Sequence, residues 1–123
     1  MIRAATAGLR LALLVGTLAG VDAADAADDG EVSAKRRGEA LFQYYCATCH
    51  GTAADGRGRA ALLYDPKPSN LRRSVVNDTY RALIIRNGGE TVGRSGAMPP
   101  WREELSESQT HDVIVFLRSI ASQ

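Results

Sequence analysis

Apolar residues recur with helical spacing in three stretches of this chain. The first stretch places four residues at i, i+3, i+4 and i+7, on one face of a helix: Gly38, Leu41, Phe42 and Tyr45. We expect this helix to open near Ser33 and to run into the cysteine-containing segment that follows it. The pattern therefore predicts an amphipathic helix in the first half of the chain.

The other two helices are marked by their caps. A helix is predicted from Asn77, a good N-cap, to Asn87, with Gly88 just past its end. Ser106 and Gln109 have the spacing of a capping box and start the last helix. The apolar stripe of that helix consists of Val113, Phe116, Leu117 and Ile120. No stretch alternates convincingly with period two, so the predicted fold class is all-α, with three or more helices.

Gly38 lies on the apolar face of the first predicted helix. A glycine inside a helix costs about 1 kcal/mol relative to alanine. The close approach of the last helix would explain the glycine, with Phe42 and Phe116 packing near the crossing. A tolerated surface glycine is the alternative interpretation.

The first residues have the order of a secretory signal peptide. Arg3 and Arg10 supply positive charge, the apolar run 11–20 follows, and small residues come next. A membrane span needs about twenty apolar residues, whereas Asp22 and Asp25 end this run early. The N-terminus therefore predicts export and not a membrane anchor.

The predicted signal peptide covers residues 1–26, with cleavage after Ala23 or Ala26. We expect residues 27–123 to form one domain, soluble and periplasmic, with no membrane span in the mature protein.

The two cysteines of the chain lie in one pentapeptide, Cys46-Ala47-Thr48-Cys49-His50. This C-x-x-C-H spacing is typical of a c-type haem attachment site. Two thiols three positions apart can each add across one of the two vinyl groups of a haem. His50 then lies under the iron with a ring nitrogen free to ligate it. We therefore predict one covalent haem c, attached through Cys46 and Cys49, with His50 as an iron ligand.

A C-x-x-C pair also occurs in thioredoxin-like redox sites and in zinc sites. A structural zinc site needs four ligands, and beyond Cys46, Cys49 and His50 only His111 remains, on a distant helical segment. A thioredoxin-like pair follows a strand in a βαβ pattern, and no β-rich run precedes Cys46. A disulfide between cysteines three apart closes too small a loop to constrain much of the unfolded chain. The haem interpretation is favoured over all three.

The iron of such a haem needs a sixth ligand, or an open position if the protein does chemistry. Because Met1 leaves with the signal peptide, Met98 is the one methionine of the mature chain, and His111 is its one other histidine. Met98 lies in the glycine- and proline-containing segment 93–101, which can wrap the far face of a haem and present a thioether. His111 falls on the side of the last helix away from the apolar stripe, where a solvated histidine is expected. Met98 is therefore the favoured distal ligand.

Together these features resemble a monohaem class I cytochrome c, over almost all of the mature sequence. The matching residues are Gly38 and Phe42, the pentapeptide 46–50 with Gly51, the turn 55–58, the segment 68–71, Met98-Pro99 and residues 116–118. The resemblance implies a helical fold wrapped around the haem, axial ligation by His50 and Met98, and shuttling of single electrons between larger partners. It also implies that Leu71 packs on the haem and that Trp101 lies near a propionate.

One departure from the family concerns the carbonyl group that orients His50. Many members place a proline some way after the haem-binding histidine, and the carbonyl of that proline accepts the ring N–H. Here that region reads Ala60-Ala61-Leu62, and the nearest prolines are Pro66 and Pro68. Such acceptors fix the ring orientation and the basicity of the ligand. The acceptor for His50 is therefore left open by the sequence.

His/Met ligation favours an electron carrier that is not itself an enzyme. A thioether stabilises ferrous iron and raises the potential, and a filled coordination shell leaves no site for oxygen or peroxide. The leading prediction is transfer between a respiratory complex or dehydrogenase and an oxidase or reductase. The alternative is a haem subunit of a periplasmic oxidoreductase, or a ligand-binding haem protein. No distal acid/base pair of the kind a peroxidase uses is evident, although Arg94 and Arg102 near Met98 keep peroxidase-like chemistry open.

The charges are unevenly distributed although the formal net charge is only +1. Nine basic residues stand against Asp65, Asp78 and Glu90 between positions 57 and 102: Arg57, Arg59, Lys67, Arg72, Arg73, Arg81, Arg86, Arg94 and Arg102. We hypothesise that a basic rim around the haem edge steers this protein to an acidic docking face on a redox partner. An ordinary solvated surface, with one or two arginines on the haem propionates, is the equal alternative. Nothing indicates a nucleic-acid partner, and we expect a monomer.

Overall fold

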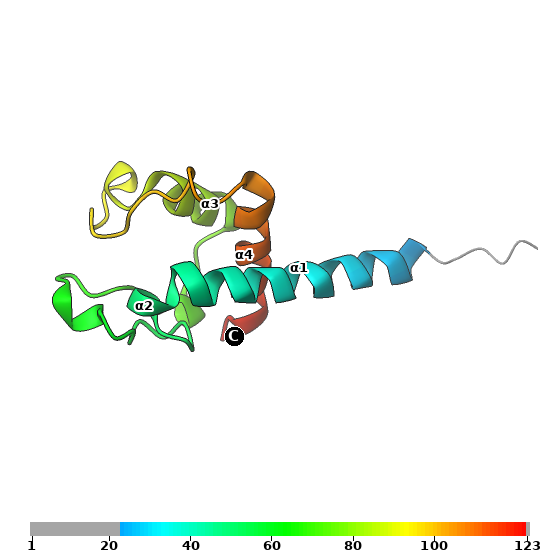
Figure 1. Cartoon of the computed structure of the whole chain (residues 1–123), viewed down its shortest axis with the longest axis horizontal. Helices are drawn as coiled ribbons and strands as arrows, with labels where there is room; N and C mark the ends of the chain where they lie inside the picture. The colour runs from blue at the N-terminus through cyan, green and yellow to red at the C-terminus, as the bar shows by residue number, and fades with distance from the viewer. Residues whose placement is uncertain (1–22, 123) are drawn as a thin grey trace, which may run out of the picture.

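The computed structural model describes residues 23–122 of the chain. Four α-helices lie in this range: α1 (Ala23–Tyr45), α2 (Ala47–His50), α3 (Asp78–Asn87) and α4 (Glu107–Ile120) (Figure 1). Three short 3₁₀ helices lie between them: η1 (Ala61–Leu63), η2 (Leu71–Arg73) and η3 (Glu90–Val92). Since residues 23–122 contain no strand, the predicted all-α fold class is confirmed. The predicted signal peptide, residues 1–26, lies mostly outside the described residues and stays a prediction.

α1 begins earlier than its apolar pattern predicted. The expected opening near Ser33 is wrong, because the helix starts at Ala23. The added segment is rich in alanine, which is the best helix former and needs no apolar stripe, and its acidic residues lie near the N-terminus of the helix, where negative charge is favourable. Residues 30–33 are exposed, and Figure 1 shows the first turns of α1 projecting away from the other helices. Periodicity therefore detected only the part of α1 that packs on the core.

The predicted caps of α3 and α4 are confirmed. The Asn77 side chain accepts the N–H of Tyr80 at 2.9 Å, and the N–H of Gly88 closes the other end on the carbonyl of Ile84. In α4, Ser106 and Gln109 bond reciprocally through side chain and backbone, at 2.9 and 3.2 Å. These local bonds fix where both helices begin, independently of the cofactor.

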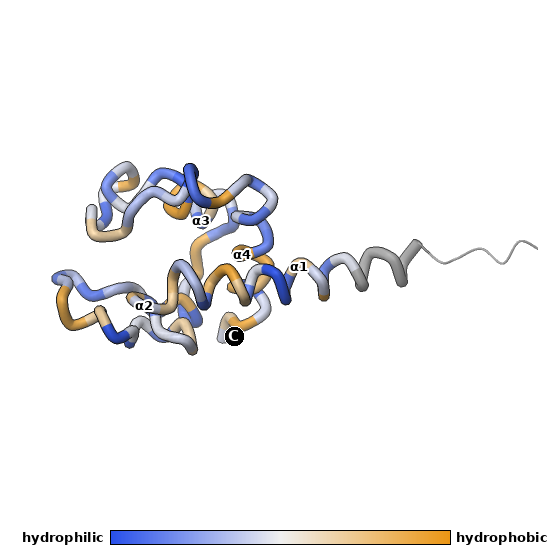
Figure 2. Tube along the Cα trace, in the orientation of Figure 1, coloured by the Kyte–Doolittle hydropathy of each residue, from blue (hydrophilic) through white to orange (hydrophobic). Residues whose placement is uncertain are grey.

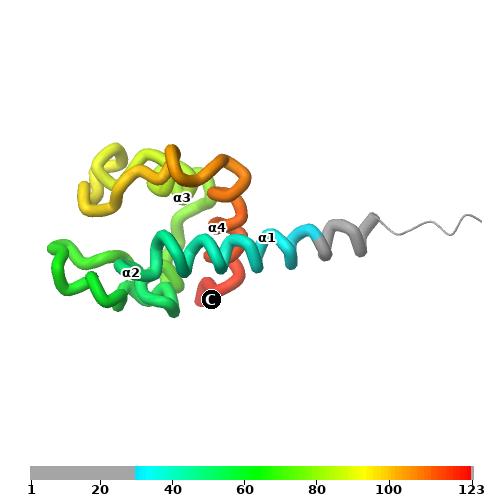
Figure 3. The backbone as a smooth tube through the Cα atoms, viewed as in Figure 1, coloured from blue at the N-terminus to red at the C-terminus, as the bar shows by residue number. Residues whose placement is uncertain are grey.

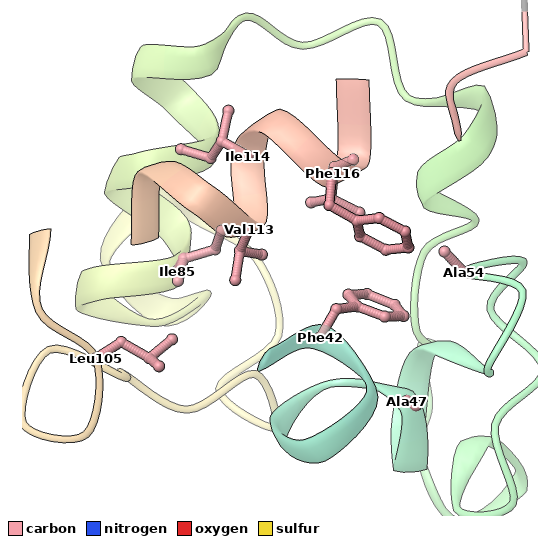
Figure 4. Packing of buried hydrophobic residues seen from close by; sticks show 9 residues of the cluster. Phe42, Ala47, Ala54, Ile85, Leu105, Val113, Ile114 and Phe116 are labelled. Atoms are coloured by element: carbon pink, nitrogen blue, oxygen red, sulfur yellow. The ribbon is translucent and has the colours of Figure 1, made fainter. Parts of the chain in front are cut away.

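Gly38 lies at the crossing of α1 and α4. A β-carbon on Gly38 would overlap the carbonyl of Asp112 and lie 2.9 Å from the backbone nitrogen of Val113. Beside it, the rings of Phe42 and Phe116 pack with centroids 5.3 Å apart (Figure 4). The predicted close approach of the last helix at Gly38 is therefore confirmed, and Figure 2 shows apolar stretches of both helices meeting there.

An ion pair fastens the same crossing. The Arg37 guanidinium donates to both carboxylate oxygens of Asp112, from Nε at 2.7 Å and from Nη2 at 2.9 Å. The Asp112 side chain is 8% exposed, whereas that of Arg37 is 59% exposed. Because a bidentate pair constrains direction as well as distance, it holds α1 and α4 in one relative position.

The helices enclose the core on one side and leave room for a site on the other. Nine buried residues form one cluster: Phe42, Ala47, Ala54, Ile85, Leu105, Val113, Ile114, Phe116 and Leu117 (Figure 4). Figure 3 shows α1 and α2 with the loop after them in one layer, and α3 with the segment after it in another. α4 joins the two layers at one end. The two sets of loops therefore face each other away from α4.

Candidate functional site

The pentapeptide with both cysteines continues almost directly from α1. The N–H of Cys46 donates to the carbonyl of Phe42, and the N–H of His50 donates to the carbonyl of Cys46, each at 2.9 Å. The short helix α2 carries Cys49 and His50 and is held against the core by the buried Ala47. Both cysteines are half-buried free thiols. The helical backbone thus presents two thiols and one imidazole from a single short segment.

These groups line a cavity with a volume of about 280 Å³. All six residues predicted to bind the cofactor contribute to its wall: Cys46, Cys49, His50, Leu71, Met98 and Trp101. They come from α2 and the Cys46 that precedes it, from η2, and from the segment between α3 and α4, so the fold brings together residues that are far apart in the sequence. Their individual roles as ligands and contacts stay predictions.

The carbonyl that orients His50 belongs to Ser69. His50 Nδ1 lies 3.0 Å from the carbonyl oxygen of Ser69, and an N–H at Nδ1 leaves Nε2 free as a ligand. The next part of this loop is anchored because the N–H of Leu71 donates to the carbonyl of Ala54 at 2.8 Å. The sequence could not identify this acceptor, since a backbone carbonyl has no side-chain signature. Its only marker was the family-like segment 68–71.

Burial affects the protonation of His50 and Cys46. Removal from water lowers the pKa of His50, against the opposing effect of the bond to Ser69, so the ring is neutral at pH 7. Burial, with a smaller contribution from Cys49, raises the pKa of Cys46 to about 12. A neutral imidazole is the form that ligates metals, whereas a reactive thioredoxin-like cysteine needs a lowered pKa. The site therefore favours a haem ligand set over a thiol redox pair.

Met98 lies in the layer opposite α2. Figure 1 shows the segment 93–101 beside α3, across from the layer that contains α1 and α2. Met98 is half-buried and lines the cavity. The other candidate ligand, His111, is exposed on α4 and does not line the cavity. Its predicted solvated position is confirmed.

Trp101 and Leu71 close the cavity wall. The Trp101 ring packs edge-on against Tyr45, with centroids 5.3 Å apart, at the end of α1. Leu71 is half-buried in η2 and packs against the core cluster. Both side chains line the cavity, where they could contact a flat apolar group.

Four further polar residues line the cavity: Tyr64, Lys67, Tyr80 and Arg81. The sequence had counted Lys67 and Arg81 among the basic residues of a possible rim, but it had not placed either tyrosine at a site. The Arg81 side chain is only 12% exposed and pairs with Asp78 at 2.8 Å. Arg94, which also lines the cavity, donates from Nε to the hydroxyl of Tyr80 at 3.3 Å. The helix predicted over residues 77–87 includes Tyr80 and Arg81, but its caps did not indicate which of its side chains would face a cavity.

This wall fits a c-type haem. Two free thiols and a neutral, oriented imidazole line the cavity from one short segment, and the Met98 thioether lines it from the segment 93–101. Apolar side chains cover much of the wall, and cationic side chains offer partners for two propionates. Cys46 and Cys49 would hold the group covalently, and His50 and Met98 would ligate its iron. When bound, it supplies a one-electron Fe(III)/Fe(II) couple.

Comparison with known proteins agrees with the site. The model of the family described as cytochrome C oxidase, cbb3-type, subunit III matches residues 33–117. The chain is 26% identical over 95 residues to the cbb3-type cytochrome c oxidase subunit CcoP of Azospirillum sp. (strain B510). It is 29% identical over 92 residues to subunit FixP of the same kind of oxidase in Azorhizobium caulinodans.

The matched regions cover much of this chain but only part of each relative. They span 77% and 74% of this chain, and 30% and 29% of the CcoP and FixP sequences. Among solved structures, a chain of the Kuenenia stuttgartiensis reducing HAO-like protein complex Kustc0457/Kustc0458 aligns with a TM-score of 0.59 and 27% identity. That alignment covers 69% of this chain and 41% of the other. With its family match, helical fold and C-x-x-C-H segment, the chain is a class I-type cytochrome c domain and belongs to the cbb3-type cytochrome c oxidase subunit III family.

Proposed function

We propose that this protein passes single electrons between larger redox proteins through one haem c ligated by His50 and Met98. The observation that carries the proposal is the placement of Met98 across one cavity from Cys46, Cys49 and His50. His/Met ligation leaves no free coordination position, so an electron enters and leaves without bond making. The protein's own part is to attach the group, orient His50 through Ser69 and exclude water with apolar walls.

The place of action is proposed to be the periplasm. The proposal is supported by the charged, apolar and small-residue order of residues 1–26, and by the attachment of c-type haem outside the bacterial cytoplasm. No helix within residues 23–122 is both long and apolar enough to span a bilayer. N-terminal sequencing of the exported protein tests the proposal, with a new terminus at Ala24 or Ala27 expected.

A second candidate is a haem subunit of a larger oxidoreductase. It is favoured by the names of the two relatives, both of which are oxidase subunits that extend well beyond the matched region. Native mass measurement of the exported haem protein separates the two candidates. A particle no larger than the 13.1 kDa chain supports a diffusible carrier, whereas a defined larger assembly supports a dedicated subunit.

Replacing the proposed distal ligand should open the iron. In Met98→Ala, we expect covalent haem to remain, the Met-to-iron charge-transfer band of the ferric protein to disappear, and the potential to fall. Carbon monoxide should then bind the ferrous form, which the wild-type protein should exclude. Absorption spectra of both oxidation states, with and without carbon monoxide, provide the measurement.

His111→Ala is the matched control for this prediction. The His111 side chain is exposed and outside the cavity, so its loss should leave the spectrum and the ligand exclusion unchanged. If instead His111→Ala opened the iron while Met98→Ala did not, the assignment of the distal ligand would be reversed.

We also propose that a basic rim around the haem edge steers an acidic partner. Seven of the nine basic residues between positions 57 and 102 are exposed: Arg57, Arg59, Lys67, Arg72, Arg73, Arg94 and Arg102. Of these, Lys67 and Arg94 line the cavity itself. Arg81 also lines the cavity, but its side chain is mostly buried and is paired with Asp78. Positive potential at the mouth of the cavity raises encounter rates with anions and lowers those with cations.

Charged small oxidants test the rim without a known partner. The rate of oxidation by ferricyanide, an anion, should fall about threefold or more between about 10 mM and 0.3 M salt. The rate with a cationic cobalt complex should rise over the same range. Stopped-flow kinetics provide the measurement, and a Lys67→Gln/Arg94→Gln variant should flatten both dependences. Rates that do not respond to salt would exclude steering.

A further inference from the structure

The end of α3 packs directly against the backbone of Met98. Gly88 and Gly89 follow the last residue of α3, and both are buried. Gly88 has φ +82°, in the left-handed region that favours glycine. A β-carbon there would lie 3.0 Å from the carbonyl oxygen of Met98 and 3.1 Å from the backbone nitrogen of Pro100. The chain therefore has no free space for a side chain at this point.

Gly89 makes the more specific contacts. Its N–H donates to the carbonyl of Met98 at 2.9 Å, and its own carbonyl accepts the N–H of Arg94 at 2.8 Å. A β-carbon on Gly89 would overlap the carbonyl of Ser95 and lie 3.2 Å from Cβ of Met98. The N–H of Met98 in turn donates to that same Ser95 carbonyl at 3.2 Å. The carbonyl of Met98 is thus held by the N–H of Gly89, and the N–H of Met98 is held by the Ser95 carbonyl, which lies beside Gly89.

A second bond ties the same segment to α3 just after Met98. The N–H of Trp101 donates to the carbonyl of Ile85 at 2.9 Å, and Ile85 is 6% exposed in the core cluster. The segment that carries Met98 is therefore bound, through Trp101, to a helix that is itself part of the core. Gly89 does not line the cavity, whereas the Met98 side chain does.

We propose that Gly89 is a positioning residue for Met98. Its hydrogen bond and its missing side chain place the Met98 thioether at the depth where it ligates the iron. The inference rests on the proposed His50/Met98 ligation and adds a residue that acts on the iron only through another. Closed coordination of the iron would then depend on the junction between α3 and the segment after it.

Gly89→Ala tests this role. The β-carbon forces Ser95 and Met98 away from residue 89, so we expect the Met-to-iron charge-transfer band to weaken by more than half and carbon monoxide to bind the ferrous form. Covalent haem content should stay at the wild-type level, because Cys46, Cys49 and His50 are untouched. The matched control is Gly96→Ala in the same segment, where the nearest atom to a β-carbon is Glu90 Oε2 at 3.8 Å. That variant should keep the full band.

A measurement on the wild-type protein covers the case in which Gly89→Ala does not fold. Cyanide displaces the thioether from ferric iron, so hydrogen exchange at the Gly89 amide, followed by NMR, should accelerate at least about tenfold when cyanide binds. Unchanged exchange would overturn the inference, as would a Gly89→Ala protein that keeps its band and excludes carbon monoxide. A wild-type protein without the band would overturn the proposed ligation first and Gly89's role with it.

Discussion

Gly38→Ala should lower the stability of the holoprotein by about 2–3 kcal/mol, which corresponds to a fall in the unfolding midpoint of roughly 10–20 °C for a domain of this size. The new β-carbon would overlap the carbonyl of Asp112, and backbone atoms cannot swing away as a side chain can. α1 and α4 would have to separate, which would loosen the Phe42–Phe116 contact. Thermal unfolding followed by helical circular dichroism provides the measurement.

Gly30→Ala in the same helix is the matched control. No atom lies within 4 Å of a β-carbon at Gly30, and the residue is exposed. There the substitution should act through helix propensity alone and stabilise the protein by roughly 0.5–1 kcal/mol. A loss of stability at Gly38 and a gain at Gly30, in the same helix, would locate the destabilising effect at the helix crossing. A similar small stabilisation at Gly38 would mean that the helices cross less closely.

The contrast between these glycines shows what the sequence could predict of the fold. The position of Gly38 on the apolar face of α1 indicated a helix crossing, because periodicity records which side of a helix is buried. The caps at Asn77 and Ser106 predicted where α3 and α4 begin, because capping is a contact between residues three apart. The start of α1 was missed, since a helix that extends past the core leaves no apolar pattern.

The site was predictable to the extent that its chemistry is local. Cys46, Cys49 and His50 lie within five residues, so their spacing alone indicated a cofactor. Met98 followed from the small number of candidate ligands. The Ser69 carbonyl could not be found in this way because it is a backbone group. Gly89 could not be found because it acts on Met98, which is close in space but does not lie at a helical spacing from it. Such supporting contacts require the folded chain.

The cysteines should carry the largest effect of any side chains in the protein. In the double variant Cys46→Ala/Cys49→Ala, we expect no covalently attached haem after export, measured by intact mass and by haem absorbance under denaturing conditions. The loss has a structural consequence, because the cavity between the two layers is lined by apolar side chains that the haem would cover. A domain of about 100 residues buries only about 60–65% of its unfolded surface, so losing a central apolar group should leave it largely unfolded at 37 °C.

Single variants and a neighbouring substitution separate attachment from folding. Cys46→Ala and Cys49→Ala should each retain one thioether bond, because each thiol lines the cavity independently of the other. Thr48→Ala, between them on an exposed position, should keep full haem content and stability. A wild-type protein with the mass of the bare chain and bound zinc or a disulfide would contradict the haem site itself. A double variant that still carried covalent haem would contradict the assignment of both cysteines. Loss of covalent haem in the double cysteine variant, together with full haem content in Thr48→Ala, would agree with a chain that folds around a haem held by its own two thiols.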